Sequence, residues 1–275
     1  MYGYGYQYGK IFGGGGLPFT PPLDVYTGAA AAYSLRLLRS AYAGSAIRVR
    51  RSSDNSESDI GFVSGVLDTA TLLTFCGVGD GFVTTWYDQS GNSNDATQAT
   101  AANQPKIVSA GSLVTENGKA AIDFDGVNDR LITSSFASTL AQPSTTFIVN
   151  NAPNNTSDNT LIDGIISSNR HLLIANANNY TLNAGAFVNT GANSDAQSLL
   201  YTLWNGASSE FASDGGTPNI INIGTHGLTG LTIGANFVSS NANDGNVQEI
   251  ILYNSDQSAN RTGIETNINS YYGIY

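Results

Sequence analysis

The sequence predicts an all-β protein, a β-sandwich jelly roll with a few short helices and an extended N-terminal arm. Short apolar runs recur along the 275 residues, segments rich in Asn, Gly, Ser and Asp separate them, and hydrophobic residues make up 41% of the chain. Short strands bounded by turn residues are typical of sandwiches and jelly rolls. We therefore expect an arm and linker over residues 1–22 and one sandwich domain over residues 23–275.

The first 22 residues differ in composition from the rest of the chain. Tyr2, Tyr4, Tyr6 and Tyr8 alternate mostly with glycine, and Phe12 precedes four glycines and a proline-rich exit. Alternate residues of a strand share a face, but glycine weakens an isolated strand, so such an arm needs a partner. We predict an assembly arm whose rings pack on neighbouring copies of the chain in a homo-oligomer such as a trimer. The alternative is a disordered tail.

A helical pattern follows over residues 28–44, where an alanine run precedes three leucines. On this helix Arg36 and Arg39 share a face, and on the strand that follows Arg48 and Arg50 share a face. We expect these arginines to face solvent rather than to form a site for an anionic partner.

The remaining elements follow from the alternation of apolar runs with turn residues. Helices are expected at 67–75 and 258–271, where apolar residues recur at helical spacing. Strands are expected at 46–51, 82–87, 105–109, 119–125, 130–133, 145–150, 159–166, 171–175, 180–188, 198–204, 219–223, 230–234 and 246–253.

Charge and composition exclude several classes of protein. The net charge of −10 argues against nucleic-acid binding, which needs a clustered cationic surface. No apolar run approaches the ~20 residues of a membrane span, so we expect no membrane insertion. The N-terminus lacks the layout of a secretory signal, and a single cysteine permits folding in a reducing cytoplasm.

Segments along the chain resemble two known groups of proteins. Tyr33–Ser52 and Thr85–Asn92 resemble the opening of a fungal arabinofuranosidase B catalytic domain. Ala121–Leu131 looks like the hairpin of laminin-G-like jelly rolls, and Leu231–Gly234 with Gly245–Tyr253 resembles their closing strands. The resemblance runs from about residue 24 to the C-terminus and implies a concanavalin A-like (laminin-G-like) sandwich.

The same resemblance implies site residues that this chain lacks. The family pairs the cysteine matched by Cys76 with a second cysteine five residues on, where this chain has Gly81. Its vicinal cysteine pair also has no counterpart here. The resemblance places the nucleophilic glutamate after a histidine, where Leu172 follows His171, and the general acid near Asn236. We therefore expect no catalytic residues and no enzymatic activity.

Other residues that could take part in catalysis are interpreted as structural. Glu249 and Glu210 could replace the missing carboxylates, but the strand pattern predicts that Glu249 is an outward-facing structural acid. His171 and His226 lack a recognisable serine or cysteine nucleophile nearby in sequence. Cys76 follows an apolar stretch, so we expect a free, buried thiol.

Two loops carry oxygen ligands that calcium prefers. The first loop contains Asp88, Ser90, Asn92, Asn94 and Asp95, of which Asp88, Asn92 and Asp95 are the candidate ligands. The second loop contains Asp123, Asp125, Asn128 and Asp129. Because aspartate and asparagine are also ordinary turn residues, we expect no cofactor and keep calcium as the alternative.

Three functions remain open. We favour a non-enzymatic bacteriophage structural protein, a fibre, spike or capsid-decorating subunit made in the host cytoplasm and located in the virion. It would bind other virion proteins through its arm and possibly host-surface glycans, and the segment Trp86–Asn92 is similar to phage tail and fibre proteins. The second is a lectin-like adhesin. The third is an arabinofuranosidase-like glycoside hydrolase with relocated carboxylates.

Overall fold

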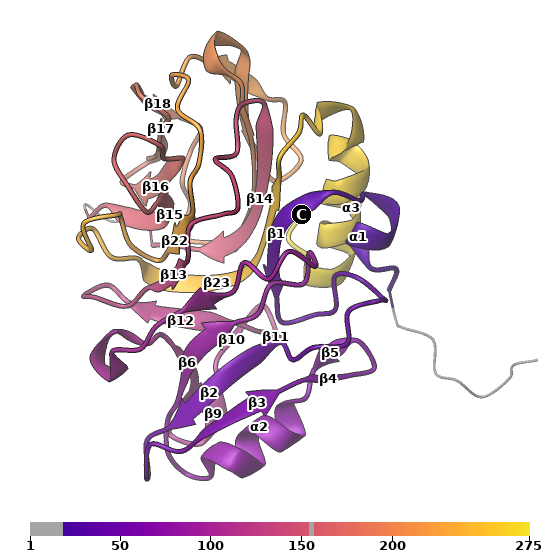
Figure 1. Ribbon diagram of the computed structural model, residues 1–275, viewed down its shortest axis with the longest axis vertical. Coiled ribbons are helices and arrows are strands. Elements are labelled where there is room, and N and C mark those ends of the chain that lie inside the picture. The colour runs from indigo at the N-terminus through magenta and orange to yellow at the C-terminus, as the bar shows by residue number, and fades with distance from the viewer. Residues whose placement is uncertain (1–18, 154–156) are drawn as a thin grey trace, which may run out of the picture.

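The computed structural model describes residues 19–153 and 157–275 as an all-β sandwich with helices on its outside (Figure 1). The predicted fold class is confirmed. The tyrosines of the predicted arm and Phe12 lie outside the described residues, so the arm remains a prediction. Its last part already contacts the sandwich, because the ring of Phe19 packs edge-on against Tyr271 with centroids 5.2 Å apart.

The described residues form three α-helices, three 3-10 turns and 23 strands. The helices are α1 (Pro22–Val25), α2 (Thr69–Cys76) and α3 (Arg261–Tyr272), with 3-10 turns at Ala101–Asn103, Gly206–Ser208 and Ser258–Asn260. The first twelve strands are β1 (Ala29–Ser34), β2 (Ile47–Arg51), β3 (Glu57–Ile60), β4 (Phe62–Val63), β5 (Val66–Leu67), β6 (Gly81–Trp86), β7 (Ala96–Thr97), β8 (Lys106–Ser109), β9 (Ser112–Leu113), β10 (Thr115–Glu116), β11 (Lys119–Ala120) and β12 (Ile122–Asp125). The others are β13 (Leu131–Thr133), β14 (Ser144–Asn151), β15 (Asn159–Gly164), β16 (Leu172–Asn176), β17 (Asn179–Asn183), β18 (Phe187–Thr190), β19 (Ser198–Trp204), β20 (Ser209–Ser213), β21 (Asn219–Ile221), β22 (Leu231–Ile233) and β23 (Asp244–Tyr253).

Two antiparallel layers face each other. The first has the order β21-β20-β19-β14-β23, and β1 and β12 share the far edge of β23. The second has the order β18-β17-β16-β15-β22-β13-β7-β6-β2-β3. Strand β8 joins the layers because it pairs with both β12 and β6.

The first layer is buried on both faces. In β14, Ile148 points into the core between the layers, whereas Phe147 and Val149 belong to a second apolar cluster. That cluster lies under α3, which contributes Ile264 and Ile268, four residues apart as the sequence predicted. The amphipathic helix therefore covers the outer face of the layer, as Figure 1 shows.

The helix predicted over residues 28–44 is wrong. Ala29–Ser34 form β1, which pairs with β23, and residues 35–46 contain no helix. Ala31 and Tyr33 pack into the inner core while Ala32 packs under α3, so the strand buries apolar side chains on both faces. This burial outweighs the high helix propensity of alanine, which is a weak preference.

The solvent-facing position predicted for Arg36 is also wrong, because its side chain is fully buried. Arg48 does lie at the surface, where it is 44% exposed beside Glu57 and Asp59. Besides β1, seven strands have no predicted counterpart, namely β3, β4, β5, β7, β9, β10 and β20. The helix predicted at 67–75 is confirmed as α2, and Asp68 caps it by accepting a hydrogen bond from the backbone N–H of Thr71.

Candidate functional site

An open hollow with polar walls lies where three loops meet at one end of the sandwich. It has a volume of about 580 Å³, and we call it the polar hollow. The loops are the turn after β12, the segment before β15 and the β22-β23 loop (residues 234–243). The residues that line it are Gly126, Val127, Ser157, Asp158, Ser239, Ser240, Asn241 and Ala242.

The turn after β12 is built by the carboxylate of Asp125. Its Oδ1 accepts hydrogen bonds from the backbone N–H groups of Val127, Asn128 and Asp129. Gly126 has a φ of 72°, and a Cβ there would lie 2.8 Å from the Cβ of Asp244. Glycine is therefore required for the turn to approach the start of β23 so closely.

Two carboxyl groups at this end of the sandwich differ in environment. Asp129 is 6% exposed, and burial, reinforced by the nearby charge of Asp125, raises the pKa of its carboxyl to about 7. A carboxyl with this pKa is partly protonated at neutral pH and can donate a proton. Asp158 is exposed and lines the hollow, and its oxygens accept hydrogen bonds from Asn176 and Asn241 at 3.3 Å each.

Asn236, the position of the expected general acid, closes the β22-β23 loop on itself. Its Oδ1 accepts from the N–H groups of Val238 and Ser240, and its Nδ2 donates to Ser240 Oγ. The next residue, Phe237, donates its backbone N–H to Asp163 Oδ2 at 2.9 Å. Asn236 thus shapes the loop that forms one wall of the polar hollow.

Leu172, the position of the expected nucleophile, is buried in β16 at 2% exposure. The preceding His171 is also buried, and its ring stacks on Trp204 with centroids 4.4 Å apart and an interplanar angle of 7°. Burial lowers the pKa of His171 to about 3, so the imidazole is neutral at physiological pH. Its Nε2 lies 3.0 Å from the carbonyl oxygen of His226. Trp204 belongs to the core between the layers, so His171 packs against that core.

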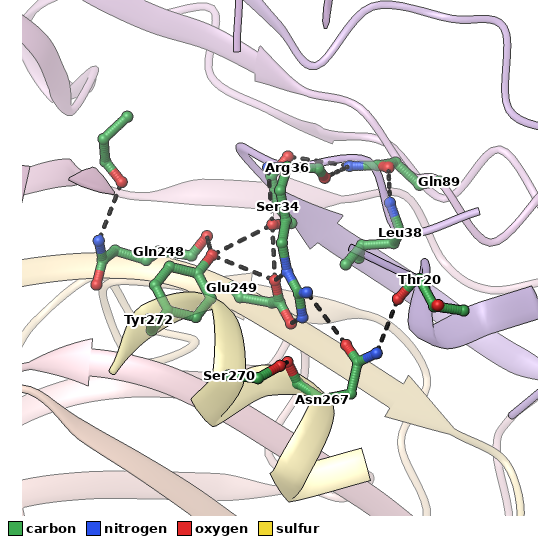
Figure 2. Close-up of polar contacts among 11 residues, drawn as sticks. Thr20, Ser34, Arg36, Leu38, Gln89, Gln248, Glu249, Asn267, Ser270 and Tyr272 are labelled. Atoms are coloured by element: carbon green, nitrogen blue, oxygen red, sulfur yellow. Dashed lines mark hydrogen bonds and ion pairs between the residues drawn. The ribbon is translucent and has the colours of Figure 1, made fainter. Parts of the chain in front are cut away.

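The outward-facing position predicted for Glu249 is wrong. Figure 2 shows its carboxylate inside the protein, where it binds Arg36 through two contacts of 2.7 and 2.8 Å. Ser34 Oγ donates to the same carboxylate at 2.8 Å, and Tyr272 Oη lies 3.2 Å from it. Glu210 accepts a hydrogen bond from Tyr201 at 2.9 Å. Both glutamates are therefore engaged in structural contacts.

The first calcium candidate is a folded loop whose oxygens already have partners. Asp88 accepts from the N–H groups of Ala32 and Asn94, and Asp95 accepts from the N–H of Asp88. The amide of Asn92 donates to carbonyl groups of the β1 segment. Within residues 19–153 and 157–275, no group of three or more His, Cys, Asp or Glu side chains could hold a metal ion. Calcium binding stays an alternative prediction.

Cys76 is buried at 3% exposure, as predicted, and burial raises the pKa of its thiol. Gly81 lies directly beside it, and a Cβ at Gly81 would be 2.6 Å from the sulfur. The backbone therefore keeps the two positions adjacent although the second cysteine is missing. Among the described residues, no helix is long and apolar enough to cross a membrane.

The sequence matches of this chain to known proteins agree on one kind of enzyme. A family model described as "Alpha-L-arabinofuranosidase B, catalytic" matches residues 22–132. This part of the chain is similar to the catalytic domain of that enzyme. A probable α-L-arabinofuranosidase B of Aspergillus flavus is 42% identical over 116 residues, which is 36% of this chain and 23% of the relative. The α-L-arabinofuranosidase B of Aspergillus oryzae is 41% identical over 116 residues, with the same shares.

Solved structures extend the similarity of fold to most of the chain. An arabinofuranosidase complexed with arabinofuranosyl-α-1,2-xylobiose matches with a TM-score of 0.71 and 18% identity, over 90% of this chain and 64% of that one. An α-L-arabinofuranosidase soaked with a cyclic sulfate inhibitor gives a TM-score of 0.71 and 17% identity, over 90% and 65%. The chain spans about a quarter of the length of the curated relatives that it matches.

These matches correct the favoured prediction of function. The family model and the curated relatives are arabinofuranosidases, so the predictions of a bacteriophage structural protein, of a virion location and of no enzymatic activity are wrong. The prediction of a virion protein depended on the missing carboxylates at Leu172 and Asn236, the missing cysteines, the lack of a secretion signal and the N-terminal arm. Leu172 and Asn236 both lie outside residues 22–132, the part of the chain that the family model matches.

Proposed function

We propose that this chain is a glycoside hydrolase domain that acts on α-linked L-arabinofuranosyl groups. The observation that carries the proposal is the match of residues 22–132 to the arabinofuranosidase B catalytic family, with 42% identity to a relative over 116 residues. The sandwich that positions the polar hollow has the same fold as solved arabinofuranosidases over 90% of the chain. Fold alone does not decide function, so the proposal rests on the sequence match.

Asp129 and Asp158 are the carboxyl groups that we assign to the reaction. Glycoside hydrolysis commonly uses two carboxyl groups, of which one is protonated and donates to the leaving oxygen. Asp129, whose pKa is raised to about 7, belongs to the turn whose Gly126 and Val127 line the polar hollow, and it is suited to that role. Asp158 lines the polar hollow and would act as the second of the two carboxyl groups that the reaction uses. The serine and asparagine side chains of the β22-β23 loop would bind the sugar hydroxyls.

The proposal is tested by the turnover of 4-nitrophenyl α-L-arabinofuranoside. We expect the wild-type protein to release nitrophenol, and Asp129→Asn and Asp158→Asn each to lower kcat/KM by about 100-fold or more, the usual contribution of general acid–base catalysis. The control Asp59→Asn changes a carboxylate that is 45% exposed on β3 and should leave turnover unchanged. No turnover by the wild type, or full turnover by both variants, would refute the proposal.

The activity should also depend on pH in one direction. Ionisation of Asp129 above about pH 7 removes the proton that it donates, so kcat/KM should fall as the pH rises through this value. A profile that stays flat from pH 6 to pH 9 would exclude Asp129 as the acid.

A further inference from the structure

We propose that the buried ion pair between Asp163 and Arg170 is a positioning element for the β22-β23 loop and thereby sets the sugar affinity of the polar hollow. The inference about affinity rests on the proposed function. Neither residue lines the hollow, so both would act through the loop above them.

The pair itself is closely built. Arg170 Nε donates to Asp163 Oδ1 at 2.7 Å, and Nη2 donates to Oδ2 at 2.5 Å. The side chain of Asp163 is fully buried and that of Arg170 is 12% exposed. Gly164 allows this approach, because a Cβ there would lie 2.7 Å from the carbonyl oxygen of Asn169 and 2.8 Å from Cα of Arg170. The segment between β15 and β16 therefore holds the Arg170 guanidinium against the carboxylate of Asp163.

Two contacts connect the pair to the loop. The backbone N–H of Phe237 donates to Asp163 Oδ2 at 2.9 Å, the same oxygen that binds Arg170. The guanidinium carbon of Arg170 lies 4.8 Å from the centroid of the Phe237 ring. The ion pair therefore contacts both the backbone and the side chain of Phe237. The side-chain amide of Asn236 makes its hydrogen bonds within the loop itself. Backbone hydrogen bonds from Gly234 N–H to the Leu161 carbonyl and from Thr160 N–H to the Asn241 carbonyl hold the two ends of the loop on β15, at 3.1 Å each. The ion pair therefore anchors the middle of the loop, at Phe237.

The position of the loop matters because residues 239–242 form one wall of the hollow. They line the hollow together with Asp158 and Gly126, and Asn241 Nδ2 donates to Asp158 Oδ2 at 3.3 Å, so a shift of the loop changes the spacing of the groups that line the hollow. Hydrogen bonds to sugar hydroxyls weaken steeply with distance and angle. Loss of the guanidinium also leaves the carboxylate of Asp163 buried without its partner, which favours rearrangement of the groups around it.

The chain offers a matched control for this experiment. Arg261 pairs with Glu265 at 2.9 Å, with exposures of 11% and 5%, and its guanidinium lies 4.7 Å from the ring of Tyr201. Arg170 and Arg261 are therefore alike in burial, in pairing and in their aromatic neighbour. They differ in place, since Arg261 begins α3 on the outer face of the first layer.

The experiment compares Arg170→Gln with Arg261→Gln by hydrogen–deuterium exchange and by the kinetics of 4-nitrophenyl α-L-arabinofuranoside. We expect Arg170→Gln to raise the exchange of amides 236–242 and to raise KM about tenfold, the effect of about 1.4 kcal/mol in binding, with kcat changed less than KM. Arg261→Gln should leave both at wild-type values even if the two variants lose similar thermal stability. Unchanged exchange, or raised exchange with an unchanged KM, would overturn the inference.

Phe237→Ala is a second variant in case Arg170→Gln does not fold. It removes the ring that contacts Arg170 while the ion pair stays intact. Like Arg170→Gln, it should raise both the exchange of the loop amides and KM. Wild-type protein that neither binds nor cleaves the sugar would refute the proposed function separately. The exchange data would then decide the positioning role alone, and equal exchange in Arg170→Gln and wild type would overturn it.

Discussion

Replacement of Glu249 by glutamine should strongly destabilise the protein, because it leaves Arg36 charged and without its carboxylate. The two side chains are 0% and 1% exposed, and they join β23 to the segment after β1 across 213 residues of sequence (Figure 2). Removing one partner of a buried ion pair costs about 3–5 kcal/mol, since the other charge remains in a medium of low polarity.

The surroundings of Arg36 place the expected loss near the lower end of that range. Its guanidinium carbon lies 5.3, 4.9 and 5.6 Å from the rings of Phe19, Tyr271 and Tyr272, and Asn267 Oδ1 accepts from Nη1 at 3.1 Å. These contacts stabilise the cation in the absence of the carboxylate, by about 0.5–2 kcal/mol for an aromatic face. We therefore expect Glu249→Gln to lower the free energy of unfolding by about 3 kcal/mol.

Urea unfolding followed by circular dichroism gives this free energy by linear extrapolation. The double variant Arg36→Met with Glu249→Leu removes both charges, and it should be more stable than Glu249→Gln because apolar side chains can replace a buried pair at little cost. Asp59→Asn, which breaks the exposed contact with Arg48, should cost less than about 1 kcal/mol. A loss below 1 kcal/mol for Glu249→Gln, or a double variant less stable than the single one, would refute the reasoning.

Three further predictions concern other parts of the chain. Gly81→Cys should form a disulfide with Cys76 under oxidising conditions, because a Cβ at position 81 would lie 2.6 Å from the sulfur, and mass spectrometry would detect the bond. Closure of so short a loop should add about 2 kcal/mol to the free energy of unfolding unless the geometry is strained. The raised pKa of Asp129 means that the folded state binds an extra proton between about pH 4 and pH 7, so this group makes stability fall as pH rises through that window. Asp129→Asn should remove this contribution, which lowers the free energy of unfolding of the wild type by about 1–2 kcal/mol between pH 5 and pH 7. Urea unfolding at the two pH values measures it, and the same pH dependence in wild type and variant would contradict the assignment. Deletion of residues 1–16 should abolish homo-oligomer formation and leave thermal stability nearly unchanged; light scattering that shows the same mass for both forms would refute an assembly role for the arm.

Most of the sandwich could be predicted from the sequence because its strands carry their own local signals. The strands predicted at 145–150 and 246–253 contain the apolar runs Phe147–Val149 and Ile250–Tyr253, are bounded by turn residues, and correspond to β14 and β23. The alanines of β1 carry no such signal. Their strand exists because β23 supplies an edge to pair with and because apolar clusters lie on both of its faces.

The buried ion pairs could not be predicted, because each depends on contacts that the sequence does not display. Glu249 alternates with apolar neighbours as an exposed strand residue would, but α3 covers that face of β23 and Arg36 reaches it from the segment after β1. Arg36 in turn looked like a surface residue because its neighbours suggested a helix. The error in one element therefore propagated to the interpretation of both charges.

The candidate site shows the same limitation for function. Sequence reasoning searched for carboxylates at Leu172 and Asn236, and their absence led to the prediction of an inactive protein. The structure places Asn236 in the loop above Asp163 and beside a hollow that is lined by Asp158, a residue which no motif had marked. A turn that looked like ordinary Asp/Asn chemistry holds Asp129, whose raised pKa requires burial and a neighbouring charge and is therefore a property of the fold. Carboxyl groups that could perform the chemistry can thus come from loops while the strands keep an apolar core, and mutation of Asp129 and Asp158 tests that arrangement directly.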